Sequence, residues 1–284
     1  MKLLQFDRKA VVIVSVEGQI GVSISNLRVV FHVKKNSTAD FNTARVSIYN
    51  LSENTRNKIK ELGNQIVVKA GYTQDAGEQV LFVGDISMSY NEIVKPETII
   101  TFEASDGEKK THQLKLSVSY KAGTGAIQIL KDVISKSAFP LKAFNWSTVT
   151  DKYYNRGFAF AGSAKVLLNN VCDYLGLEWS IQNNEIKLVK SGASDGAQVV
   201  YLTPGTGLIG SPSRLRDVGT KSKKDKNIEG WKLDCLLQPM LEPGGVVKVK
   251  SADIPEGLYR IIDVEHSGDT HGTEWKSTLT VSAI

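Results

Sequence analysis

Short runs in which apolar and polar residues alternate make up most of this chain of 284 residues. Alternation places successive side chains on opposite faces of an extended strand, so it predicts strands with one buried face. Such runs lie within residues 10–33 and again before Tyr49. Ser52 is then a good helix N-cap and Gly63 a good C-terminal stop, which predicts a short helix over residues 53–62. The chain therefore opens as a β-rich segment with one helix.

An internal echo links residues 66–105 to residues 240–281. In the first copy, the strand-like runs IVVKAGY, VLFVGDISMSY and ETIITFEAS follow one another, separated by polar turns. In the second copy, GGVVKVKSA, GLYRIIDVEH and TEWKSTLTVSA come in the same order. Self-similarity of this kind predicts a duplicated structural module, and a duplicated β-module is typical of assembly proteins rather than enzymes.

The two copies can be aligned through their middle runs. Setting Ile86 against Ile262 and Met88 against Val264 brings apolar residues into register at a spacing of two. This spacing is the one that strands with a single buried face require. The alignment predicts that each copy contributes equivalent strands to an equivalent sheet.

A different pattern occupies the middle of the chain. GAIQILKDVISKS and GSAKVLLNNVCDYLG carry apolar residues at helical spacing, and Gly176 ends the second of these helices. LEWSIQNNEIKLV alternates around Asn183 and Asn184, which tolerate the positive φ of a tight hairpin turn. We expect a mainly β protein, α+β overall, in which two β-barrel or sandwich modules are joined by a small α/β domain. The expected boundaries are 1–111, 112–190 and 191–284.

Composition changes this picture little. Hydrophobic residues make up 41% of the chain and charged residues 23%, which is ordinary for a globular protein. No apolar run approaches the roughly 20 residues that span a bilayer, so no membrane anchor is expected. Asp7, Arg8 and Lys9 interrupt the position where a signal peptide needs an apolar core. Cys172 and Cys235 are too few for a disulfide framework and are expected to be buried apolar residues.

The net charge of +5 is concentrated in one run over residues 219–229. This run has no interleaved aromatic residue to stack on bases and no arginine to read base edges, so it resembles a solvated loop more than a nucleic-acid site. It remains a candidate loop for contact with a partner, through Lys221, Lys223, Lys224 and Lys226.

Two motifs suggest ligands. GTGLIG at residues 205–210 matches a dinucleotide fingerprint, but Pro212 and Ser213 follow where a helix must begin, so we interpret it as a turn and expect no cofactor. HSGDTHGTEW concentrates potential metal ligands between two strands, and its glycines indicate a hairpin tip rather than a metal site. The potential ligands are His266, Asp269, His271 and Glu274.

Catalytic signatures are sparse. No G-x-S-x-G elbow occurs, and a pair of carboxylates for glycoside hydrolysis depends on spatial proximity that a sequence does not show. The candidate carboxylates lie in patterns that strand ends and turns explain: Asp85, Asp106, Glu178 and Asp263. The tryptophans that could stack on sugars are Trp146, Trp179, Trp231 and Trp275. A non-enzyme is favoured, and a β-rich cell-wall glycan hydrolase or a carbohydrate-binding module is the alternative.

Several motifs together resemble the baseplate hub proteins of contractile phage tails and tail-like bacteriocins. They are RVSIYNLSENTRNKI, VKAGY, FVGDI and TFEASDG in the first half, and LLQPMLEPGG with GLYRIIDVEHSGDTHGTEW in the second. The resemblance covers most of the chain and is most specific in the last fifty residues. No fused lysozyme and no long β-helical repeat accompanies it.

The resemblance implies a structural protein of the virion, assembled in the cytoplasm of the bacterial host. Each chain would carry two tube-like β-domains, and three chains would close into a ring with pseudo-sixfold symmetry. Such a homotrimer would join the sixfold tail tube to the threefold central spike and contact other baseplate proteins. DNA and the tape-measure protein would pass through its channel without specific binding, and the resemblance implies no catalytic, metal or cofactor residue. The duplicated module agrees with this arrangement.

Overall fold

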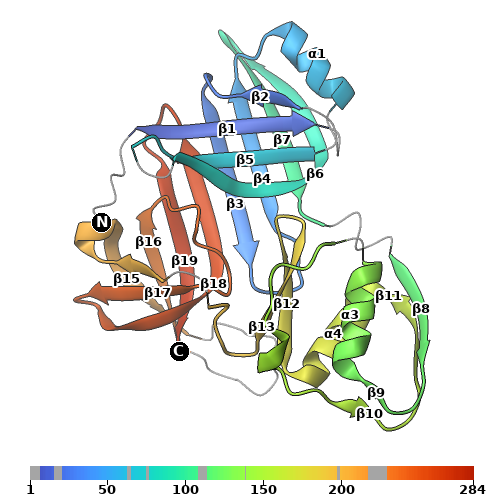
Figure 1. Cartoon of the computed structure of the whole chain (residues 1–284). Coiled ribbons are helices and arrows are strands. Elements are labelled where there is room, and N and C mark those ends of the chain that lie inside the picture. Colours follow the sequence, from blue (N-terminus) through green and yellow to red (C-terminus); the bar gives the residue numbers. More distant parts are fainter. Residues whose placement is uncertain are drawn as a thin grey trace.

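The computed structural model describes residues 7–15, 21–62, 65–74, 77–107, 114–137, 139–196, 199–216 and 229–284. Figure 1 shows an N-terminal β-module, a C-terminal β-module beside it, and a middle unit that contains two helices. Strands dominate the described residues, so the prediction of a mainly β, α+β fold is confirmed. Each of the three parts has its own cluster of buried apolar side chains.

The N-terminal module is an antiparallel sheet in the order β3-β4-β7-β6-β5-β1-β2. Its inward side chains alternate along each strand, as in β4, where Ala44, Val46 and Ile48 are buried. The predicted helix α1 (Glu53–Leu62) is confirmed, and the Ser52 hydroxyl caps it by accepting a hydrogen bond from the Thr55 amide at 3.2 Å. The strands are β1 (Arg8–Ser15), β2 (Val22–Ile24), β3 (Val29–Asn36), β4 (Thr43–Tyr49), β5 (Gln65–Tyr72), β6 (Gly77–Val94) and β7 (Glu97–Ser105).

The C-terminal module repeats much of this order, as β15-β16-β19-β18-β17-β14. All its neighbours are antiparallel except β14 and β17, which run parallel. Its core contains Leu233, Val264 and Leu279, all at most 1% exposed. The strands are β14 (Val200–Leu202), β15 (Leu208–Leu215), β16 (Gly230–Leu236), β17 (Val246–Ser251), β18 (Ile254–Asp269) and β19 (Trp275–Ala283).

The two copies of the sequence echo form equivalent three-stranded meanders. The order β3-β4-β7-β6-β5 matches β15-β16-β19-β18-β17 strand for strand. A register shift interrupts β6 between Ile86 and Met88, and β18 has the same shift between Ile261 and Asp263. These bulges align Ile86 with Ile261, so the alignment of Ile86 with Ile262 was wrong by one residue. Exposure agrees, because Met88 is 53% exposed whereas Val264 is fully buried.

The middle unit packs helices α3 (Ala126–Lys136) and α4 (Ala164–Leu175) together around Ile129, Leu130 and Leu167. Gly176 ends α4 in the left-handed conformation, with φ of 73°. Asn183 and Asn184 have φ of 56° and 65°, which confirms the predicted hairpin turn between β12 and β13. The strands are β8 (Lys115–Tyr120), β9 (Thr124–Gly125), β10 (Tyr153–Tyr154), β11 (Phe158–Ser163), β12 (Leu177–Gln182) and β13 (Glu185–Lys190).

The β12–β13 hairpin extends from the middle unit toward the two β-modules (Figure 1). Its turn meets the end of β7, because the Asp106 carboxylate accepts a hydrogen bond from the Asn183 amide at 3.2 Å. The hairpin therefore attaches the helical part to the N-terminal β-module. Among the described helices, none has the length and apolarity needed to cross a bilayer.

Candidate assembly surfaces

The two β-modules are joined edge to edge by β3 and β18. These strands pair antiparallel from Asp263 opposite Asn36 to Asp269 opposite Val30, so both modules belong to one sheet of 13 strands. β18 serves two partners along the same edge, because its first part pairs with β17 and its last part with β3. The N-terminal and C-terminal modules are thus held together by a continuous hydrogen-bond ladder.

Ion pairs on one face of the sheet reinforce this junction. Lys34 and Glu265, directly opposite each other, form an ion pair at 3.0 Å. Arg28 donates hydrogen bonds to both oxygens of Asp269, at 3.2 and 2.8 Å. This guanidinium, through its hydrogen bonds, holds the pKa of Asp269 below its usual range. Complementary cross-strand pairs of this type fix the register of a sheet.

The candidate metal ligands are used within this junction and do not converge. The His266 ring is fully buried, and its Nδ1 lies 2.8 Å from the Ser277 hydroxyl. Asp269 is occupied by Arg28 and by the His271 amide, which donates at 2.9 Å. No group of three or more potential ligands forms anywhere in the described residues. The interpretation of this segment as a structural hairpin tip agrees with these contacts.

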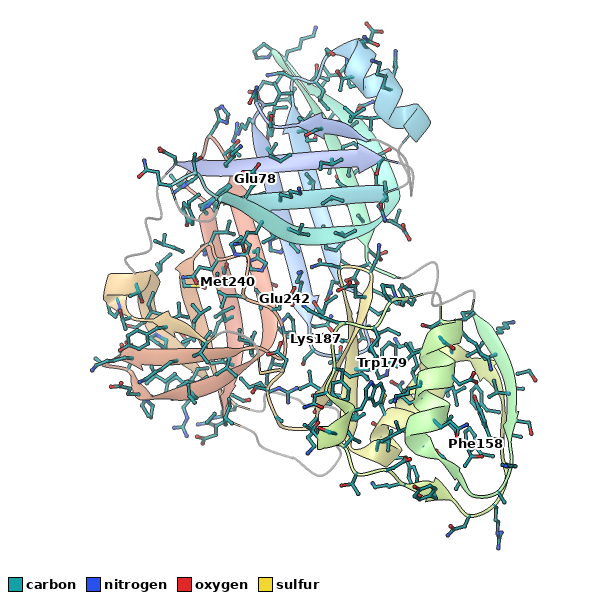
Figure 2. All side chains as sticks on the ribbon, in the orientation of Figure 1. Glu78, Phe158, Trp179, Lys187, Met240 and Glu242 are labelled. Carbon is teal, nitrogen blue, oxygen red and sulfur yellow. The ribbon has the colours of Figure 1, made fainter. Side chains whose placement is uncertain are left out.

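A buried ionic cluster ties the middle unit to both modules. Glu242, in the loop before β17, lies 3.8 Å from the Lys35 ammonium of β3, 3.7 Å from Lys187 of β13 and 2.7 Å from Lys142. Figure 2 shows Glu242 and Lys187 close together where the three parts meet. Burial raises the pKa of Glu242, but the charges of Lys35 and Lys187 outweigh it and lower the pKa to about 2. Glu242 is therefore ionised and offsets buried positive charge.

A second polar contact lies beside this cluster. Asp106 is fully buried after β7, and Asn42 donates to it from both its amide nitrogen and its side chain, at 2.9 and 2.8 Å. The Asn42 side chain also donates to the Ile181 carbonyl of the hairpin, at 2.8 Å. Burial raises the pKa of Asp106 to about 7 despite these hydrogen bonds. The contact fixes the hairpin against the N-terminal module.

We expect the buried His266 to make the protein acid-sensitive. Burial, with the nearby Lys35 charge, lowers its pKa from 6.5 to about 3. A folded-state pKa below the unfolded value means that the unfolded chain binds the proton first, so the stability that the neutral ring provides is lost as pH falls from about 6.5 toward 3. A His266→Gln variant should lose less melting temperature than the wild type between pH 7 and 5.

Comparing the wild type with the His266→Gln variant isolates the contribution of His266 to the pH dependence of stability. Asp106 titrates with the opposite sign, since its raised pKa removes stability as pH rises from 3.8 to about 7. The stability that ionised Glu242 provides is lost only as pH falls from 4.5 toward 2, outside the range compared. Both groups are present in the wild type and the variant. Identical melting-temperature profiles would contradict the role assigned to His266.

A cavity of about 520 Å³ lies between the middle unit and the C-terminal module. Lys142, Lys187 and Glu242 line its polar side, and Met240, which is 44% exposed, lines its apolar side. The polar residues are already paired with one another in the ionic cluster. The cavity therefore belongs to the seam between two parts of the chain.

Several strand edges lack a described partner, among them those of the short strands β2 and β14. Two others are the outer edge of β15, which pairs only with β16, and the edge of residues 88–94 of β6 that faces away from β7. β5 covers β6 only as far as Asp85. Exposed edges of this length are templates for pairing with another chain.

The remaining sequence candidates do not form a reaction site among the described residues. GTGLIG begins in a 3-10 turn (Pro204–Thr206) and ends within β15, so a strand and not a helix follows the turn. Glu178 forms an ion pair with Arg260, and Asp106 is inaccessible. Trp179 and Trp275 are 5% and 2% exposed, and Trp146 and Trp231 are partly buried, so none presents a fully exposed face to a sugar. Lys221, Lys223, Lys224 and Lys226 lie outside the described residues.

Comparison with solved structures identifies known proteins that share this fold. A 43 kDa tail protein of prophage MuSo2 from Shewanella oneidensis is similar over 98% of both chains, with a TM-score of 0.64 at 8% identity. A tail protein from Neisseria meningitidis is similar over 98% of this chain and 97% of its own, with a TM-score of 0.63 at 10% identity. The chain has the fold of phage tail proteins.

This tail-protein fold extends to secretion machinery. A type VI secretion system component from Escherichia coli, described as structurally similar to the T4 tail proteins gp27 and gp5, matches 90% of this chain and 73% of its own. Its TM-score is 0.59 at 11% identity. A chain of the Francisella PdpA–VgrG complex matches all of the present chain, and the match covers 53% of the length of the Francisella chain. No protein-family model and no curated protein matches the sequence.

Proposed function

We propose that this chain is a structural baseplate hub protein of a contractile phage tail. The observation that carries the proposal is the repeated strand order, β3-β4-β7-β6-β5 and β15-β16-β19-β18-β17, within a chain whose whole length matches tail proteins. Duplication of a module within a chain allows three chains to present six similar units. The ring then meets a sixfold tail tube on one side and a threefold spike on the other.

In this role the two β-modules surround the channel, and DNA and the tape-measure protein pass through it without specific binding. The modules are domains in their own right, divided from the middle domain near residues 111 and 190. The protein does no chemistry, and its partners are two further copies of itself, the tube protein, the spike and other baseplate proteins. Its place is the virion, after assembly in the host cytoplasm.

Light scattering coupled to size exclusion tests this proposal. The purified chain at micromolar concentration, alone and then with its candidate spike, should give in at least one sample a species containing three chains of 31.1 kDa. The spike provides a template for a ring whose edges are otherwise exposed to solvent. A monomer in both samples would overturn the hub proposal and favour a glycan-active or glycan-binding protein.

A further inference from the structure

The junction between the two β-modules is made by two strand edges, and each chain carries a second, unpaired equivalent of both edges. The paired halves are β3 and the last part of β18. By the matching strand order, the equivalent of β3 is β15, and the equivalent of the last part of β18 is the segment 88–94 of β6. No described strand covers either of these two edges. The internal junction is therefore a template for a junction between chains.

Backbone direction can be read at the internal junction. The Ser37 amide donates to the Ile262 carbonyl, and the Thr270 amide donates to the Val29 carbonyl. Because alternate residues of a strand direct their backbone groups to opposite sides, odd residues of β3 and even residues at the end of β18 face each other. Val33 and His266 are thus a directly opposite pair whose backbone groups point toward each other.

The outer edge of β15 presents its backbone in the same way. The Leu236 amide donates to the Gly207 carbonyl, just as the Tyr49 amide donates to the Arg28 carbonyl in the N-terminal module. The register between β15 and β16 shifts between Ile209 and Ser213, and beyond this shift Arg214 lies opposite Trp231. Trp231 has the same position in β16 as Ala44 has in β4, and Ala44 lies opposite Val33, so Arg214 is the equivalent of Val33. The amide and carbonyl of Arg214 therefore point away from β16 toward the open edge.

The open segment of β6 also directs backbone amide and carbonyl groups toward its free edge. The Asn50 amide donates to the Thr98 carbonyl, so even residues of β7 face β4 and odd residues, including Thr101, face β6. Tyr90 lies opposite Thr101 and so directs its backbone toward β7. Asn91 directs its own backbone outward, as its equivalent His266 does toward β3.

We propose that the open segment 88–94 of β6 pairs antiparallel with the outer edge of β15 of a second copy of this chain, with Asn91 opposite Arg214 and the paired part running from Ser89 to Glu92. The inference deepens the proposed hub function and rests on it. The contact is heterologous, because one chain gives β6 and the next gives β15, so repetition produces a closed ring if the rotation between modules closes. The same geometry within and between chains makes all module contacts alike.

The exposed side chains support this pairing. Met88, Ile93 and Val94 are 53%, 72% and 50% exposed on the β6 segment, and Ile209 is 42% exposed on β15. Exposed apolar side chains along an open strand edge are characteristic of a surface that is covered in an assembly. Met88 and its neighbours lie on a free edge of a described sheet, so a second chain can reach them.

The sequence of β15 also limits the length of the ladder. Pro212 lies just before the paired segment of β15 and has no amide hydrogen to donate. The ladder between chains should therefore extend from Arg214 toward Arg216 and end at Pro212.

A disulfide tests the register. With Asn91 opposite Arg214, the next antiparallel pair is Glu92 opposite Ser213, and both of these side chains are exposed in the single chain. A Glu92→Cys, Ser213→Cys double variant should form covalent dimers and trimers under mild oxidation, seen on a non-reducing gel. Burial raises the pKa of both native thiols, Cys172 and Cys235, so they do not compete.

Controls separate this contact from others. Each single variant alone should stay uncrosslinked, whereas their equimolar mixture should give a covalent dimer, which only a heterologous contact produces. A Glu92→Cys, Arg214→Cys variant is one residue out of register, and its two thiols lie on opposite faces of the sheet. Its yield of covalent dimer should be at least about tenfold lower.

The outcomes distinguish the inference from the function. If light scattering shows a trimer, with or without spike, but the in-register variant gives no more crosslink than the out-of-register one, the strand pairing is wrong and the hub proposal stands. If the wild type stays monomeric with and without spike, both fall. Covalent trimer from the in-register variant alone supports both.

Discussion

Replacing Glu242 by glutamine should destabilise the protein by about 3–5 kcal/mol at neutral pH, which is the cost of removing one partner from a buried ion pair. The Lys35 side chain is 0% exposed and that of Lys187 only 4%. Lys187 keeps Asp195 at 2.5 Å, whereas Lys35 has its ion pair with Glu242 alone among the salt bridges of the described residues. The free energy of unfolding, from urea denaturation followed by circular dichroism, measures the loss.

A matched control removes a glutamate from the same region without leaving a buried charge. Glu265 pairs with Lys34, and both side chains are well exposed, at 41% and 57%. A Glu265→Gln variant should lose less than about 1 kcal/mol, as exposed ion pairs do. A loss of similar size in both glutamine variants would contradict the importance of burial at Glu242.

Lys35→Met provides a second check on the same interaction. In the Glu242→Gln background, this substitution removes the uncompensated charge and should recover part of the lost stability. The recovery appears as a coupling energy in the double-mutant cycle. Additive losses would mean that the buried Lys35 charge does not depend on Glu242.

The sequence predicts much of the local structure because local physics determines it. The Ser52 cap, the Gly176 stop and the Asn183–Asn184 turn each follow from one or two residues, and all three are present. The order of strands in the two meanders also follows, because consecutive strands joined by short turns pair with each other. The helix and hairpin of the middle unit are recovered for the same reason.

The bulges and the module junction were not predicted, because they depend on contacts between distant strands. One extra residue in β18 shifts the alternation by one position, and nothing in the apolar pattern around Ile262 reveals it. Pairing of β3 with β18 joins residues more than two hundred positions apart. A sequence pattern on either strand predicts a buried face but not the partner at its edge.

The alternation along β3 already indicates the ionic cluster. Val29, Phe31, Val33 and Lys35 occupy alternate positions on β3, so the alternation alone places the Lys35 side chain on the buried face with the three apolar residues. A lysine at an inward position requires a carboxylate. Its partner, Glu242, lies in LEPGG, a segment whose proline and glycines indicate a turn, and only the fold brings the two together.

Gly268→Ala is expected to destabilise the module junction by about 1–3 kcal/mol, the usual cost of overpacking a close-packed core. A Cβ atom at Gly268 would lie 2.3 Å from Cζ of Phe31 and 2.9 Å from Cε3 of Trp275. Both rings are only 2% exposed and pack edge to face at 5.4 Å, so neither can move aside without disturbing the core. Thermal unfolding of the variant against the wild type measures the effect.

Gly257→Ala, in the same strand, is the matched control. Its added methyl group would meet no atom closer than 3.7 Å, and the loss of chain freedom in the unfolded state makes the substitution neutral or slightly stabilising. Equal losses at the two positions would show that a glycine in β18 matters for backbone reasons rather than for space beside Phe31. The residue equivalent to Gly268 on β6 is Ile93, and it would face Pro212 rather than a buried aromatic ring, so the proposed junction between chains has no need of a glycine there.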